Sequence, residues 1–72
     1  MMKGASMNQA EDVKQYIQDQ LVDQDWVKEV FLEQDDLGWN VMVKVDGVAY
    51  RDSGHRVPGM LNDVSVMTMM IG

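Results

Sequence analysis

The sequence contains no cysteine, one histidine and one proline in 72 residues. Without cysteine there is no disulfide and no thiolate metal ligand, and a single histidine cannot supply a histidine-based zinc cluster. A chain this short buries only about 60% of its unfolded surface, so its core is marginal. Small domains of this kind commonly gain stability from a partner surface. We therefore expect neither a metal nor any other cofactor.

Basic residues are scarce, because six Lys and Arg stand against twelve Asp and Glu, for a formal net charge of −6. Nucleic-acid backbones and anionic membranes both attract basic proteins, so neither is an expected direct partner. No apolar run approaches the roughly 20 residues of a membrane helix. Residues 1–4 lack the apolar stretch of a secretory signal. Together with the lack of cysteine, this favours a cytoplasmic protein.

Residues 39–50, WNVMVKVDGVAY, carry the strongest local pattern. Asp46-Gly47 is a preferred two-residue hairpin turn, because both positions accept a positive φ at low cost. A chain reversal there pairs Val45 with Val48. The period of two along each strand then places six side chains on one buried face: Trp39, Val41, Val43, Val45, Val48 and Tyr50.

A helix is predicted over residues 9–23. Its apolar residues recur at steps of three and four along one stripe: Ala10, Val13, Ile17 and Leu21. Capping-box spacing occurs at residues 6–9 and again at residues 8–11.

Residues 26–34 are rich in β-branched and aromatic side chains and predict a strand. Residues 35–38 predict a turn that joins this strand to the next as an antiparallel hairpin. Glycine and proline predict a loop over residues 53–59, while residues 60–63 suit either one helical turn or a bulged lead-in. The last strand is predicted over residues 63–71.

These elements predict an α+β fold, with one N-terminal helix packed on an antiparallel sheet of three to four strands in an αββββ meander. We assign residues 1–7 to a disordered N-terminal segment or a cloning scar. Residues 8–72 form a single small α+β domain.

Apolar residues occur on both faces of strands 26–34 and 63–71, although a single helix covers only one face of a sheet. Self-association through the other face of the sheet, or through the edge of the last strand, would cover the apolar side chains that the helix does not reach. The alternative is a monomer in which methionine and valine side chains are simply exposed to solvent, as apolar side chains often are. The candidate interaction residues are Trp26, Phe31, Met67, Met69 and Ile71. We expect Trp26 to be partly exposed and Trp39 to be buried.

Arg51, His55 and Arg56 flank or lie in the predicted loop and are candidates for contact with an anion or a partner. The alternative is a solvated loop histidine. Ser53 lies two residues before His55, but this spacing does not supply the geometry of a nucleophilic triad. No phosphate-binding loop or catalytic motif is present, so we do not expect an enzyme.

Nine acids and two lysines fall within residues 11–36, a net charge of −7. We expect a small acidic protein-interaction or structural adaptor domain that self-associates as a homodimer. The alternative is an acidic inhibitor, of the type made by phages and mobile elements, that mimics nucleic acid and blocks a nucleic-acid-binding protein.

Overall fold

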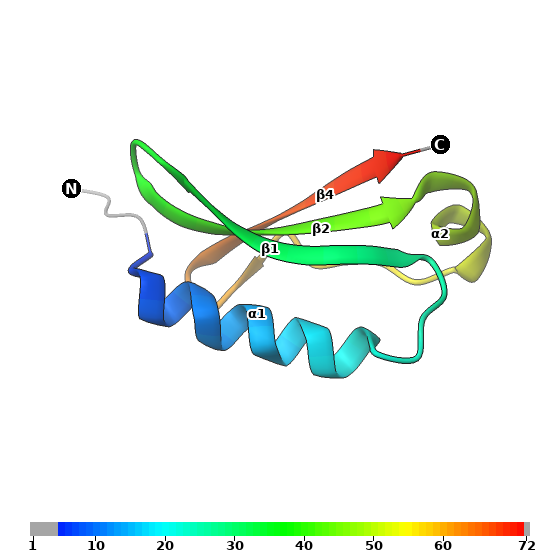
Figure 1. Cartoon of the computed structure of the whole chain (residues 1–72), viewed down its shortest axis with the longest axis horizontal. Coiled ribbons are helices and arrows are strands. Elements are labelled where there is room, and N and C mark those ends of the chain that lie inside the picture. Colours follow the sequence, from blue (N-terminus) through cyan, green and yellow to red (C-terminus); the bar gives the residue numbers. More distant parts are fainter. Residues whose placement is uncertain (1–4, 72) are drawn as a thin grey trace.

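The computed structural model describes residues 5–71. Along the chain its elements are α1 (Met7–Leu21), β1 (Val27–Asp35), β2 (Gly38–Asp46), α2 (Gly47–Ser53), β3 (Met60–Leu61) and β4 (Val64–Ile71). Figure 1 shows α1 lying along one face of a sheet in which the strands follow the order β1-β2-β4-β3. This arrangement confirms the α+β class and the N-terminal helix on a four-stranded sheet. Among the described residues, neither helix combines the length and apolar character needed to cross a membrane.

The capping box at Ser6 starts α1 two residues earlier than predicted. Gln9 N donates to Ser6 Oγ at 3.2 Å, and Ser6 N donates to Gln9 Oε1 at 3.0 Å. Two of the helix-end donors are thereby satisfied. The predicted apolar stripe is confirmed, because Ala10, Val13 and Ile17 are buried against the sheet.

Of the predicted N-terminal segment, residues 1–4 lie outside the described residues, while residues 5–7 belong to the fold. Ala5 is buried and forms an isolated antiparallel bridge with Trp39, whose N donates to Ala5 O at 3.0 Å. This bridge attaches the start of α1 to β2.

The turn at residues 35–38 joins β1 to β2 as predicted. Asp35 Oδ1 accepts from Leu37 N at 2.8 Å and from Gly38 N at 3.0 Å. Gly38 has a φ of 142°, a conformation that glycine adopts without the steric cost of a side chain. The pairing is antiparallel and places Val30 opposite Val43.

The predicted hairpin at Asp46-Gly47 is wrong, because Asp46 caps a helix instead. Asp46 has a φ of −73°, and its Oδ1 accepts from Val48 N at 3.1 Å and from Ala49 N at 3.2 Å. An aspartate before glycine suits both a tight turn and a helix N-cap, since its carboxylate accepts backbone N–H groups in either setting. Val48, expected in the core, is 62% exposed.

The chain after α2 crosses over and returns through β4, which pairs with β2 in parallel, Val43 opposite Thr68. The sheet is therefore mixed, and the predicted antiparallel meander is wrong in this respect. The sequence of residues 60–63 suited either a helical turn or a bulged lead-in to the last strand. In the structure these residues form β3 and a tight turn, in which Asn62 and Asp63 have φ of 48° and 65°. The predicted loop is confirmed in residues 54–59, which contain no strand.

The core lies between α1 and the sheet and is rich in valine. Its largest fully buried side chains are Val41, Val43, Val45 and Val64. Trp26 is 3% exposed and its ring lies 4.8 Å, centroid to centroid, from that of Tyr50. The partial exposure expected of Trp26 is wrong, because α2 folds back and places Tyr50 over it. Trp39, expected to be buried, packs against the core but is only half-buried.

Candidate interaction surfaces

The face of the sheet opposite α1 carries a row of apolar side chains across three strands. Phe31 on β1 lies opposite Met42 on β2, and Met42 lies opposite Met67 on β4. Residues opposite one another on neighbouring strands share a face, and alternate residues along a strand return to it. Met69 and Ile71 therefore lie on the same face as Met67. We call this set, Phe31, Met42, Met67, Met69 and Ile71, the open face.

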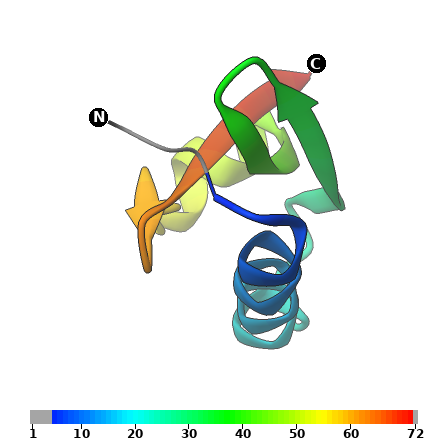
Figure 2. The same cartoon turned by 90° about the vertical axis from the view of Figure 1, so that its left-hand side faces the viewer.

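No helix within residues 5–71 covers the open face, since α1 lies on the other side of the sheet (Figure 2). Met67, Met69 and Ile71 remain 51%, 38% and 43% exposed. Met42 is only 5% exposed and lies at the centre of the row, between Phe31 and Met67. Four of the five predicted interaction residues thus meet on one surface.

Charged groups on β1 and β2 share the open face, and Lys44 lies directly opposite Met69, whereas β4 contains no charged residue. Lys44 Nζ lies 3.4 Å from Glu29 Oε1 and 5.8 Å from the centre of the Phe31 ring. Protein–protein interfaces combine apolar side chains with polar and charged groups in this way. The open face therefore has the composition of a contact surface.

Trp26 does not contribute to the open face, because it lies in the core beside α2. Met42 belongs to it but was not among the predicted interaction residues. The period of two along residues 39–45 assigns Met42 to the side opposite Val41 and Val43. Nothing in that pattern shows that Phe31 and Met67 would flank it.

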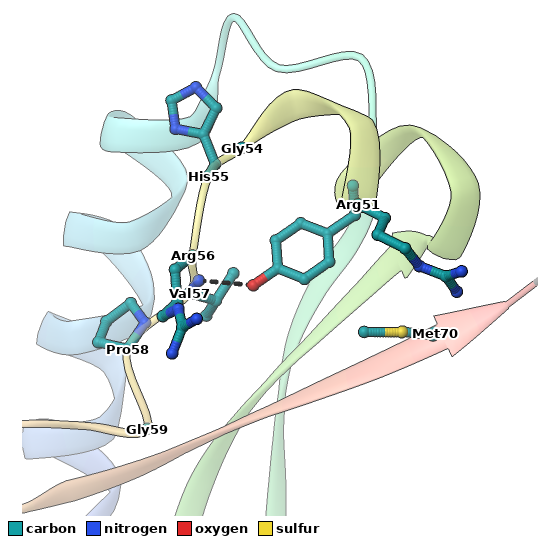
Figure 3. A pocket seen from close by; sticks show the side chains of 9 residues that line it. Arg51, Gly54, His55, Arg56, Val57, Pro58, Gly59 and Met70 are labelled. Atoms are coloured by element: carbon teal, nitrogen blue, oxygen red, sulfur yellow. Dashed lines mark hydrogen bonds between the residues drawn. The ribbon is translucent and has the colours of Figure 1, made fainter.

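The three predicted anion-contact residues, Arg51, His55 and Arg56, all line one hollow of about 640 Å³. Its walls come from α2, from residues 54–59 and from Met70 on β4 (Figure 3). Val57 N donates to the Tyr50 hydroxyl at 2.8 Å, which fixes the Tyr50 ring as part of the wall. Sequence reasoning placed Tyr50 in a strand and so did not find it here.

Within residues 5–71 the single ion pair is that between Lys44 and Glu29, so Arg51 and Arg56 have no carboxylate within 4.0 Å there. Both arginines are exposed. In Figure 3 the His55 ring turns away from both guanidinium groups, and it lies 5.8 Å from the Trp26 ring. The hollow therefore offers two unpaired positive charges beside an apolar wall.

The serine and histidine of the loop do not form a nucleophile–base pair. Ser53 Oγ donates to Tyr50 O at 2.7 Å and accepts from His55 N at 3.0 Å. The hydroxyl proton is therefore held by a backbone carbonyl and the oxygen by a backbone amide. Nucleophilic catalysis instead needs the hydroxyl to donate to the base.

The nine acids of residues 11–36 are all exposed, but they lie on different sides of the molecule. Glu11, Asp12 and Asp19 lie on α1, whereas Glu29 and Glu33 share the face of Lys44 and Asn40. Asp35 accepts from Asn40 Nδ2 at 2.9 Å, and this bond, with those from the amides of Leu37 and Gly38, lowers its pKa. No group of three acidic or histidine side chains suited to a metal ion occurs in the described part of the chain.

Comparison of the chain with protein-family models, with curated proteins and with solved structures found no match. The functional argument therefore rests on the two surfaces just described.

Proposed function

We propose that this chain is a non-catalytic protein-interaction domain that self-associates as a homodimer through the open face. The observation that carries the proposal is the row Phe31–Met42–Met67, which crosses three strands on a face that no helix of the described chain covers. Contiguous exposed apolar patches with polar groups around them mark protein–protein interaction sites.

A second copy is the partner that this surface fits best. The row is apolar at its centre, so two copies related by a two-fold axis can pack their sheets face to face. Glu11, Asp12 and Asp19 on α1 then lie on the outside of the pair, where their repulsion is screened by solvent. Glu29 and Glu33 lie on the open face itself, on its β1 side. A domain of this size has a marginal core, so the apolar area buried between two copies adds substantially to its stability.

Mimicry of nucleic acid is less well supported, because the acids of α1 and those of β1 do not form one continuous array. The two functions respond differently to salt. A contact with a basic partner weakens steeply as ionic strength rises, whereas an apolar contact does not.

Sedimentation equilibrium over a range of concentrations tests the proposal directly. The chain should shift from one to two copies as concentration rises, and the shift should persist in high salt. Met67→Lys should weaken association roughly tenfold or more, because it places a charge within the desolvated contact.

Met7→Lys is the matched control, because Met7 is 48% exposed but lies at the start of α1, away from the open face. It should leave the association unchanged. A single-copy mass at every concentration, or equal effects of the two substitutions, would contradict the proposed contact.

A further inference from the structure

The two outer strand edges of the sheet differ in their protection. The β1 edge carries Lys28, Glu29, Glu33 and Asp35, and charges of this kind discourage the addition of another strand. The β4 edge is covered by β3 only at Val64 and Ser65. Beyond Val66, β4 has neither a charge nor a proline along residues 67–71.

The backbone of β4 presents unpaired groups along this stretch. Val66 N points to the outer edge, where it donates to Gly59 O at 3.0 Å. Because backbone groups of alternate residues in a strand point the same way, Thr68 and Met70 direct their N–H and C=O groups to that edge as well. No strand pairs with them within residues 5–71. The edge thus offers two donors and two acceptors to an added strand.

The hollow of Arg51 and Arg56 adjoins this edge. Met70 lines the hollow and is 58% exposed. Its side chain lies on the face of Val45, its partner on β2, and therefore on the side away from the open face. A strand added at the edge would direct alternate side chains towards the Tyr50 wall and the two guanidinium groups (Figure 3).

We propose that the β4 edge binds an extended acidic segment of a partner protein by strand addition. Backbone groups of Thr68 and Met70 pair with the segment, and its carboxylates reach Arg51 and Arg56. Strand addition draws affinity from main-chain hydrogen bonds and specificity from pockets that receive alternate side chains. The β4 edge and the adjoining hollow are distinct from the open face, so the acidic segment can bind to a monomer or to a homodimer.

The charge of the hollow favours an acidic segment over the β4 strand of a second copy. β4 contains no carboxylate and would leave both arginines without partners. A segment that alternates acidic and apolar residues directs its carboxylates to the guanidinium groups on the hollow's side of the sheet and its apolar side chains to the opposite side.

Fluorescence anisotropy with a labelled eight-residue peptide of alternating valine and glutamate tests the proposal. The peptide should bind, and a peptide of alternating valine and lysine should not. The double variant Arg51→Ala with Arg56→Ala should weaken binding roughly tenfold or more, since charge-assisted hydrogen bonds are lost. Lys14→Ala with Lys28→Ala removes the same charge elsewhere and should change binding less than about twofold.

The backbone component is tested separately with Thr68→Pro, which removes an outward N–H and keeps the inward N–H groups of Met67 and Met69 that face β2. Binding of the valine–glutamate peptide should be lost while the circular dichroism of the fold is retained. If this variant does not fold, the same peptide methylated on alternate backbone nitrogens provides the test with the unmodified chain. One of its two methylation registers should bind and the other should not.

Three results would overturn the proposal. The first is no binding of the valine–glutamate peptide at concentrations up to about 1 mM. The second is equal loss of binding in the arginine and lysine double variants. The third is a fall in the mass of the peptide-free protein on Thr68→Pro, which would assign the edge to a second copy.

Discussion

Two aspartates, Asp35 and Asp46, follow the same local chemistry at the ends of neighbouring strands. Each carboxylate accepts two backbone N–H groups from residues two and three positions ahead. After Asp35 the chain reverses through Gly38, whereas after Asp46 it continues into α2. The side-chain hydrogen bonds of an aspartate therefore favour the end of a strand, but they do not determine whether a turn or a helix follows.

Asp35 provides a prediction at the residue scale. The bond from Asn40, and then those from the amides of Leu37 and Gly38, favour the charged carboxylate and lower its pKa. Asn40→Ala should move that pKa back towards its ordinary value, as followed by the carboxyl chemical shift during an NMR pH titration. Asn8→Ala removes an exposed amide on α1 and should leave the Asp35 pKa unchanged.

The sign of the linkage follows from the lowered pKa. A group whose pKa is depressed by folding stabilises the folded chain above its unfolded pKa, and this stabilisation disappears as pH falls through the folded value. Asn40→Ala should therefore destabilise the chain more at neutral pH than at strongly acidic pH. An effect independent of pH would exclude the Asn40 bond as a source of the shift.

At the scale of elements, the short helix α2 depends on its two ends. Seven residues are too few for a helix to be stable alone, so Asp46 at the start and Gly54 at the end hold it in place. Gly54 has a φ of 75°, in the left-handed region that favours glycine at a helix C-terminus. The position of α2 in turn places Tyr50 over Trp26 and Arg51 in the hollow.

Gly54→Ala should lower the free energy of unfolding by about 1 kcal/mol, because alanine resists the left-handed conformation. The added methyl group meets no atom within 4 Å, so the cost is conformational alone. Gly59→Ala is the control, since it too meets open space but has no positive φ of this kind. It should be neutral or slightly stabilising in urea denaturation. Equal losses at both positions would contradict the conformational explanation.

At the scale of the whole molecule, β2 organises the structure. It pairs with β1 on one side and with β4 on the other, and its valines face α1. The crossover through α2 makes the second pairing parallel, which joins residues more than 20 positions apart in the sequence. The mixed sheet leaves one face and part of one edge without cover among the described residues, and both proposed contacts arise from this arrangement.

Amide hydrogen exchange should reveal this organisation. The slowest amides should be those of β2 that pair with its neighbours, because they exchange only on global unfolding. Val66, which donates to Gly59 O, should be protected, whereas Thr68 and Met70 should exchange quickly in the dilute chain. Protection of Thr68 and Met70 equal to that of Val66 would mean that the edge already has a partner.

Features that depend on neighbours in the sequence were predicted correctly. The capping box of Ser6, the turn of Asp35 and the alternation of Met67, Met69 and Ile71 each require only a few adjacent residues. The topology could not be predicted in the same way, because an Asp-Gly pair suits both a hairpin and a helix cap. The burial of Trp26 was missed for the same reason, since the residue that covers it comes from α2.

The sequence by itself determined the α+β class, the limits of most elements and the two-faced character of β1 and β4, because these follow from local hydrogen bonding and side-chain periodicity. Only the tertiary structure decided that β4 pairs in parallel with β2, that Trp26 is buried and that Arg51 and Arg56 border the β4 edge. Those features depend on which distant segments pack together, and that choice is made by burial of the valine core rather than by any short stretch of chain.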